Sequence, residues 1–234
     1  MRLGVLETPD FQRLIADKRI ERAPVVEVFK RQPREVILAV LVRLAEQSPG
    51  YIFNAFVFTY GTTVLGASRN LLLSGLVVAS VLGSIWVPIA GALSDRLGRR
   101  RMYVTGCLSV ALFVFVYFTL LNSKVPGLIF VAVALSFLPV MTMYGPQASM
   151  IAEAFTPRLR YSGASIGYQF ASIVAGGLAP FISTWLFASY HSTIPISIYV
   201  VICAAISIFA CCLLTGRAKE NDSFEVHTSP PLRS

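Results

Sequence analysis

The sequence predicts an all-α membrane protein with six transmembrane helices. Hydrophobic residues make up 55% of its 234 residues and charged residues only 14%, whereas soluble domains carry about 25% charged residues. Mean hydropathy is +0.68. Most charges gather in residues 1–35, in residues 94–101 and after residue 215, which leaves long apolar stretches between them. An apolar stretch of about 20 residues is long enough to cross roughly 30 Å of hydrocarbon.

Six stretches qualify as spans. In chain order they are residues 36–66, 71–93, 102–121, 127–155, 162–189 and 194–215. They are apolar all round, whereas helices of a soluble bundle keep a polar face, and they lack the alternating pattern of an outer-membrane barrel. The first, fourth and fifth are longer than one crossing requires, so we expect them to be tilted or broken. The expected breaks are at Pro49-Gly50, Gly145-Pro146 and Gly176-Gly177.

Basic residues lie almost entirely on one side of this predicted bundle. Eight lie within residues 1–35, four in the connection between the second and third spans, two in the next connection on that side and three in the tail. The opposite side carries only Arg69 and Lys124. Because positively charged loops stay in the cytoplasm, both termini are predicted to be cytoplasmic. An even number of spans agrees with this orientation.

The two terminal segments are predicted to lie outside the membrane. Residues 1–35 form a cytoplasmic linker with weak amphipathic character. A helix on the membrane surface, a helix against a partner domain and a solvated linker all remain open for it. Residues 216–234 are polar and are predicted to be a disordered cytoplasmic tail.

The sequence contains no recognisable catalytic, metal-binding or cofactor-binding motif. The four cysteines lie within apolar stretches and are expected to pack as small apolar residues. His191 and His227 fall in a connection and in the tail, which does not suit a catalytic triad or a metal site. No phosphate-binding glycine-rich loop is present, so ATP-driven transport is unsupported. The basic residues do not alternate with aromatic residues, and no nucleic-acid partner is expected.

Two charged residues lie inside the first predicted span. Arg43 and Glu46 are three residues apart and share one face of a helix. Glu46 lies about 15 Å beyond Val36, near the middle of the bilayer, where inserting a charge costs roughly 2.5–3.5 kcal/mol. Such residues either serve a transport path or neutralise each other. Arg43 suits an anionic substrate, whereas Glu46 can take up a proton and suits proton coupling or pairing.

Other polar residues inside the spans are candidates for a solute path. They include Tyr60, Gln147 and Gln169, although any one of them is equally suited to a contact between helices. Gln147 follows a Gly-Pro pair, which either kinks a helix or lines a cavity. Glu153, near the cytoplasmic end of the fourth span, is expected to pair with an arginine of the following connection.

The connection between the second and third spans, residues 91–101, is the most charged internal segment. It reads Gly-Ala-Leu-Ser-Asp-Arg-Leu-Gly-Arg-Arg-Arg. A carboxylate at the membrane edge can bind a helix N-terminus or an arginine across a domain interface, and breaking that contact can separate two states. The alternative is a basic loop that only sets the topology. We expect Gly91 to allow close helix packing and Gly98 to form a tight turn. The residues of this predicted gating loop are Gly91, Asp95, Arg96, Gly98, Arg99 and Arg100.

The gating loop resembles the signature loop of the major facilitator superfamily of transporters. Further segments resemble one branch of it, the metabolite:proton symporters that carry citrate, 2-oxoglutarate, shikimate, proline or betaine. Residues 2–11 are similar to the segment that ends the sixth helix of that family, and residues 43–46 resemble part of its seventh. Residues 144–148 and 160–168 resemble its tenth and eleventh helices. A small departure is Thr156-Pro157, where the family reads Pro-Thr.

The resemblance implies a proton-coupled symporter of small organic acids or zwitterions in the inner membrane, without a cofactor. Members have twelve spans in two halves, with solute bound between them. This chain resembles the C-terminal half, and residues 1–35 would follow a missing sixth helix. Its expected partners are the bilayer, a small metabolite, protons, and an N-terminal six-helix half, on which Asp95 is expected to latch. Three alternatives remain: a non-transporting remnant, an interaction subunit of a split transporter, and a homodimer that rebuilds twelve spans.

Overall fold

The computed structural model describes residues 24–156 and 159–228, and within these ranges it is helical and contains no strand. Five helical segments are long and apolar enough to cross a membrane, and a bent pair of helices makes a sixth. In chain order the helices are α2 (Pro24–Arg31), α3 (Pro33–Val42), α4 (Leu44–Tyr51), η1 (Ile52–Phe56), α5 (Val57–Thr63), α6 (Arg69–Leu97), α7 (Arg99–Asn122), α8 (Pro126–Leu135), α9 (Phe137–Glu153), α10 (Arg160–Ala171), η2 (Ser172–Gly177), α11 (Ala179–Tyr190) and α12 (Ile194–Thr228).

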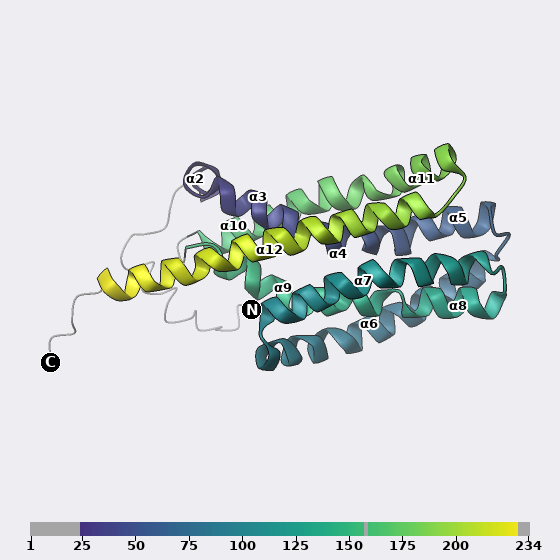
Figure 1. The fold of residues 1–234 in the computed structure, drawn as a ribbon, viewed down its shortest axis with the longest axis horizontal. Helices are drawn as coiled ribbons and strands as arrows, with labels where there is room; N and C mark the ends of the chain where they lie inside the picture. The colour runs from purple at the N-terminus through teal and green to yellow at the C-terminus, as the bar shows by residue number, and fades with distance from the viewer. Residues whose placement is uncertain (1–23, 157–158, 229–234) are drawn as a thin grey trace, which may run out of the picture.

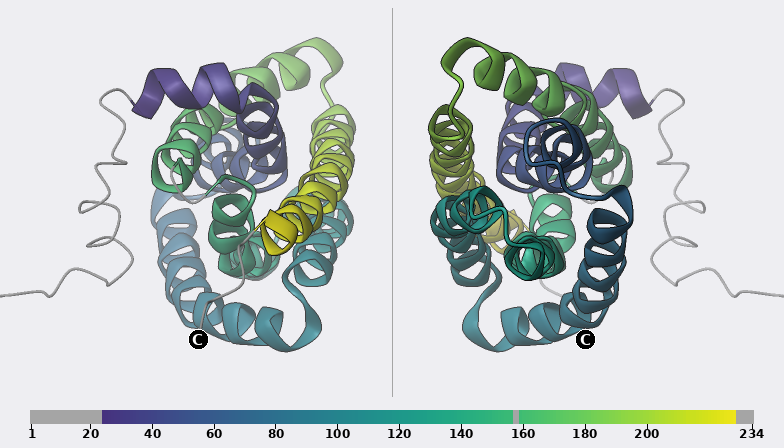
Figure 2. Two further views of the ribbon diagram at one scale, coloured as in Figure 1. Left: turned by 90° about the vertical axis from the view of Figure 1, so that its left-hand side faces the viewer. Right: turned by 90° about the vertical axis from the view of Figure 1, so that its right-hand side faces the viewer.

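The six crossing units run alternately up and down (Figure 1). The connections α5–α6, α7–α8 and α11–α12 lie at one end of the bundle, and the α6–α7 connection lies at the other end with α2. Viewed along the bundle, α9 lies between α6 and α7 (Figure 2). The sixth unit, α12, packs against both α7 and α3 and so joins the two sides of the bundle.

The first span is broken, but not where the sequence predicted. Its bend of 40° lies at Arg43, between α3 and α4. The expected break at Pro49-Gly50 is wrong, because α4 runs through both residues. A π-helical turn, η1, follows directly after α4. A π-helical turn is a short irregularity within a continuing helix. The first span therefore remains helical from Pro49 through η1.

The expected break at Gly145-Pro146 is also wrong, and the fifth span stays one helical segment through Gly176-Gly177, where its π-helix ends. Helix α9 contains Pro146 in its interior, and the fourth span is interrupted at Ser136, between α8 and α9. In the fifth span, α10 gives way to the π-helix η2, which ends at Gly177. The first and fifth spans thus each contain a π-helical segment.

Both terminal segments are more structured than expected in the described ranges. Helix α2 packs on α10, with Val28 fully buried and the rings of Phe29 and Phe170 5.8 Å apart. This favours a helix against the bundle over a solvated linker; residues 1–23 lie outside the described ranges. The predicted disordered tail is helical through Thr228, because α12 continues past the last apolar residues. Extending an existing helix costs far less than starting one.

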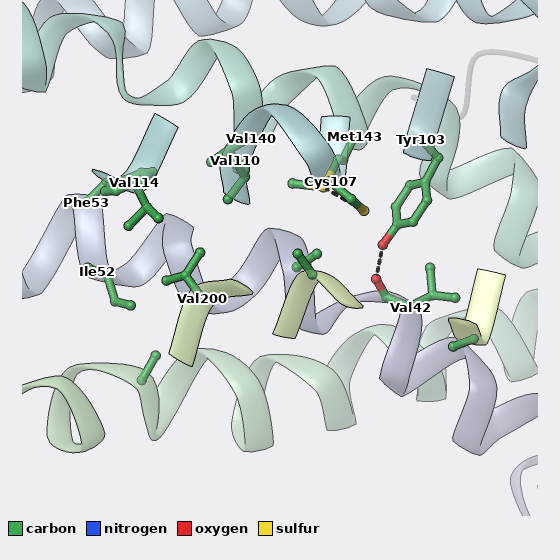
Figure 3. Packing of buried hydrophobic residues seen from close by; sticks show 14 of the residues in the cluster. Val42, Ile52, Phe53, Tyr103, Cys107, Val110, Val114, Val140, Met143 and Val200 are labelled. Carbon is green, nitrogen blue, oxygen red and sulfur yellow. Dashed lines mark hydrogen bonds between the residues drawn. The ribbon is translucent and has the colours of Figure 1, made fainter. Parts of the chain in front are cut away.

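The core draws apolar side chains from helices throughout the bundle, including η1, α7, α9 and α12 (Figure 3). Ile52 and Phe53 of η1 face Val114 of α7 and Val200 of α12. Phe53 also packs on Tyr117, with ring centroids 4.5 Å apart. Because this packing surrounds the first span from several helices, the bend at Arg43 lies inside the bundle.

Candidate functional site

The site is centred on the ion pair between Arg43 and Glu46. Arg43 Nη2 lies 2.8 Å from Glu46 Oε2, and Arg43 Nε donates to the same oxygen at 3.3 Å. The two side chains are only 4% and 10% exposed. The sequence prediction that they share a helix face is confirmed, although Arg43 occupies the break itself rather than a regular turn.

Tyr168 of α10 completes the surroundings of the Arg43 guanidinium. Arg43 Nη1 donates to the backbone oxygen of Tyr168 at 3.2 Å, and Arg43 Cζ lies 3.8 Å from the centroid of the Tyr168 ring. An arginine over an aromatic face gains a cation–π attraction that grows when water is excluded. Tyr168 was not predicted as a site residue, because an aromatic residue within an apolar helix is normally a packing residue.

Polar side chains continue along α4 beyond the pair. Gln47 and Ser48 are both buried. The Ser48 hydroxyl lies 3.2 Å from the hydroxyl of Tyr199 in α12 and 3.4 Å from the backbone oxygen of Ala175 in η2. Glycine is required at Gly176, where an added Cβ would lie 3.0 Å from Gln47 Oε1 and closer still to a tyrosine ring. The π-helix η2 therefore brings its backbone close to the polar face of α4.

Gln147 is fully buried in α9, and neither atom of its side-chain amide has a hydrogen-bond partner among the described residues. Leaving such a group unpaired costs about 1–3 kcal/mol. A buried amide without an internal partner is suited to binding a polar solute or water. Of the predicted polar candidates, Gln147 is thus the one whose hydrogen-bonding capacity remains unused inside the bundle.

Tyr60 and Gln169 do not join this site. Tyr60 lies at the other end of the first span, about 25 Å along the chain from Arg43, where it donates to Asn122. It lines a hollow there together with His191 and Lys124. Gln169 follows Tyr168 but is exposed. Of the predicted site residues, the structure therefore brings Arg43 and Glu46 into contact and leaves Tyr60 far from both.

Two adjoining hollows lie away from the ion pair. They have volumes of about 360 and 390 Å³ and share Trp86 of α6, Ser109 of α7 and Thr142 of α9. Trp86 Nε1 donates to Thr142 Oγ1 at 2.8 Å across this space. Neither Arg43 nor Glu46 lines them, and their walls are mainly apolar. Charge and hydrogen-bonding capacity, rather than open volume, therefore identify the candidate site.

The gating loop covers the end of α6, the connecting residue Gly98 and the start of α7. Gly98 has a φ of +95°, which confirms the predicted turn, since only glycine adopts such a conformation readily. The Arg99 side chain contacts Glu153 at the end of α9 and lies 3.6 Å from Asp95. Glu153 therefore contacts Arg99 of this loop, whereas the sequence predicted Arg158 or Arg160 as its partner; Arg158 lies outside the described ranges.

The close helix packing predicted for Gly91 depends on a different glycine. A Cβ added to Gly91 would meet nothing within 4 Å, whereas one added to Gly145 would lie 2.8 Å from the Gly91 nitrogen. Helices α6 and α9 do approach at this point, but the missing side chain is that of Gly145. Arg96 and Arg100 are both exposed, and Arg100 Nη2 lies 3.0 Å from the sulfur of Cys212 in α12.

A family model and several curated relatives match the chain. A family model described as "Sugar (and other) transporter" matches residues 9–228. The shikimate transporter of Escherichia coli K12 is 34% identical over 225 residues, which are 92% of this chain and 50% of the relative. The inner membrane metabolite transport protein YhjE of the same organism is 31% identical, covering 81% of this chain and 44% of the relative. A proline/betaine transporter of Escherichia coli K12 is 33% identical over 57% of this chain and 27% of the relative.

The chain spans about half the length of the curated relatives it matches. No solved structure matches it significantly. The relatives are named as transporters and not as enzymes. The broken, apolar spans, the charged turn between α6 and α7 and the extent of the family match agree with one another. The chain belongs to the sugar (and other) transporter family of the major facilitator superfamily and corresponds to about half of a full-length member.

Proposed function

We propose that the chain acts as the C-terminal half of a proton-coupled symporter for small organic acids or zwitterionic metabolites. The observation that carries this proposal is the buried ion pair between Arg43 and Glu46 at a helix break. Buried charges inside a membrane span are costly and are typical of substrate and ion pathways. The names of the relatives, which include shikimate and proline/betaine transporters, support a substrate that carries a carboxylate.

The geometry suits a competition for the Arg43 guanidinium. Two of its nitrogens donate to Glu46 Oε2, and a third donates to the backbone of Tyr168. When Glu46 takes up a proton, it loses the charge that holds Arg43. A substrate carboxylate can then take the place of Glu46 as the acceptor, because arginine stays protonated and binds carboxylates through two nitrogens. Proton binding and substrate binding would thereby favour each other.

The gating loop supplies the second element of the proposal. Asp95 is 66% exposed and therefore accessible to a partner. We infer that it binds the N-terminal half of the transporter in one of two states and releases it in the other. We propose that the loop and both termini lie on the cytoplasmic side of the inner membrane, as the distribution of basic residues predicts.

The proposal is tested by co-expressing the chain with an N-terminal six-helix half and measuring uptake of labelled shikimate and proline into proteoliposomes. We expect uptake that depends on both halves and increases with an inward proton gradient. Arg43→Ala should abolish uptake while membrane insertion is unchanged. The matched control is Arg69→Ala, which removes an exposed arginine at the opposite end of the bundle and should leave uptake intact.

Each alternative predicts a different result in the same assay. Uptake by the purified chain alone, with the mass of a dimer, would favour a homodimer. Absence of uptake with any N-terminal half would favour a non-transporting remnant or an interaction subunit. Normal uptake by Arg43→Ala would contradict the role proposed for the ion pair, even if the chain transports.

A further inference from the structure

A hydroxyl group replaces one backbone hydrogen bond at the break of the first span. In a regular helix the Ala45 N–H would donate to the Leu41 carbonyl, four residues earlier. Here the Ala45 N–H donates to Ser207 Oγ at 2.9 Å, and the Ser207 hydroxyl donates to the Leu41 oxygen at 2.8 Å. Ser207 belongs to α12, so the inserted group comes from the sixth span.

A second hydroxyl binds the adjacent carbonyl. The Val42 oxygen would normally accept from the Glu46 N–H, which instead donates to the Arg43 oxygen at 3.3 Å. The hydroxyl of Tyr103, from α7, donates to the Val42 oxygen in its place (Figure 3). Both Ser207 and Tyr103 are fully buried. Neither hydroxyl is therefore satisfied by solvent, and each has its bond at the break.

We propose that Ser207 and Tyr103 form a hydroxyl clamp that holds the first span bent at Arg43. A hydroxyl inserted into the backbone ladder is a recognised cause of a sharp helix bend. The clamp binds Leu41 and Val42 before Arg43 and Ala45 after it, so it sets the direction in which the Arg43 and Glu46 side chains point. Ser207 and Tyr103 are thus positioning residues for Arg43 and Glu46, and their effect on transport rests on the function proposed above.

The clamp differs from an ordinary polar contact between spans. A serine that joins two helices normally bonds to a carbonyl whose helix ladder is intact. Ser207 instead lies between the Ala45 N–H and the Leu41 carbonyl. These two groups are four residues apart in the sequence and would bond directly in a regular helix. Removing the Ser207 hydroxyl leaves the Ala45 N–H without its partner in an apolar interior and takes one donor away from the Leu41 carbonyl. They can regain a bond by closing on each other, which straightens the span.

The test measures the bend without requiring transport. Genetically encoded spin labels are placed at Ile37 of α3 and Leu112 of α7, both of which are exposed, in the full chain in lipid nanodiscs. Pulsed electron paramagnetic resonance then gives the distance between them. From the bend at Arg43 to Ile37, the arm is about 9 Å long. Straightening it through the observed 40° would move its end by roughly 6 Å.

We expect Ser207→Ala to shift this distance by several ångström and Ser207→Thr, which keeps a hydroxyl, to leave it unchanged. The matched control is Ser197→Ala, since Ser197 is also buried in α12 but its hydroxyl donates to Thr193, the residue just before the same helix. Tyr103→Phe keeps the ring and frees a single carbonyl, so a smaller shift is expected. Unshifted distances in both Ser207→Ala and Tyr103→Phe would overturn the clamp.

Transport adds a separate measurement in the assembled transporter. Ser207→Ala is expected to raise KM for the substrate about tenfold, which corresponds to about 1.4 kcal/mol, and Ser207→Thr is expected to restore it. A distance shift without any transport by the unmodified protein would uphold the clamp and reject the proposed function. Transport by the unmodified protein, together with an unshifted distance in both Ser207→Ala and Tyr103→Phe, would support the proposed function and reject the clamp.

Discussion

The buried pair of Arg43 with Glu46 and the group of Asp95, Arg99 and Glu153 both join opposite charges, and their surroundings differ sharply. Arg43 and Glu46 are 4% and 10% exposed and lie at a break inside the bundle. Asp95, Arg99 and Glu153 are 66%, 37% and 53% exposed and lie at the end where α6, α7 and α9 meet. The residue types are nearly the same, so the difference between the clusters comes from where the fold places them.

This difference determines what each cluster can do. Exposed ion pairs contribute roughly 0–1 kcal/mol and are weakened by salt, so the cluster at the α6–α7 turn can exchange partners at little cost. A buried pair is more demanding, because removing one partner leaves a charge without compensation. The inner cluster is therefore suited to holding and releasing a solute, and the outer one to contacts that form and break.

The largest expected effect comes from breaking the inner pair. Arg43→Ala should destabilise the chain by about 3–5 kcal/mol, since it leaves the Glu46 carboxylate buried alone. The double variant Arg43→Met/Glu46→Leu should recover most of that loss, because it removes both charges and keeps the volume. Unfolding in one fixed detergent measures both. Equal instability of the single and double variants would show that the charge of Glu46 is not the cause.

An intermediate effect is expected from the helix contact near the outer cluster. Gly145→Ala should cost about 1–3 kcal/mol, because the added Cβ meets the backbone of α6. Gly91→Ala is its matched control. It meets nothing within 4 Å and should be neutral or slightly stabilising, by up to about 1 kcal/mol. The same unfolding assay compares them. A larger loss of stability for Gly91→Ala than for Gly145→Ala would contradict the assignment of the close helix contact to Gly145.

The smallest effect is expected from the outer charges themselves. Asp95→Asn removes one exposed carboxylate and should change stability by no more than about 1 kcal/mol. The change should fade as salt rises from about 0.1 M to about 1 M, where the screening length falls from about 10 Å to about 3 Å. Asp95→Asn should nevertheless slow uptake by the assembled transporter. A large loss of stability in Asp95→Asn that persists at high salt would show that the exposed cluster contributes as strongly to stability as the buried one, contrary to this prediction.

The spans could be predicted from the sequence because a bilayer imposes a simple requirement of length and apolarity. Each predicted span has a helical counterpart that begins within a few residues of it, and all but α12, which continues to Thr228, also end within a few residues of it. The pairing of Arg43 with Glu46 was also predictable, since a spacing of three residues places two side chains together on any helix. The glycine turn at Gly98 followed from the same local reasoning. These features depend on neighbours within one or two turns of the chain.

The breaks and the surroundings of the ion pair could not be predicted in this way. Pro49 and Pro146 suggested breaks that the structure does not show, while the span bends at Arg43, where no proline or glycine occurs. The bend coincides with bonds from Ser207 and Tyr103, which lie 60 or more positions further along the chain. Tyr168 likewise reaches Arg43 from a distant helix.

The sequence alone determined the membrane class, the number of spans and the position of a charged pair within the first span. These are local properties, because the length of an apolar stretch and the spacing of residues on a helix depend only on consecutive residues. Which backbone bonds break, which glycine permits contact between α6 and α9, and which aromatic ring covers Arg43 are set by packing between distant helices. A hydroxyl can replace a backbone hydrogen bond only when another helix brings it within about 3 Å. That distance exists only in the assembled bundle.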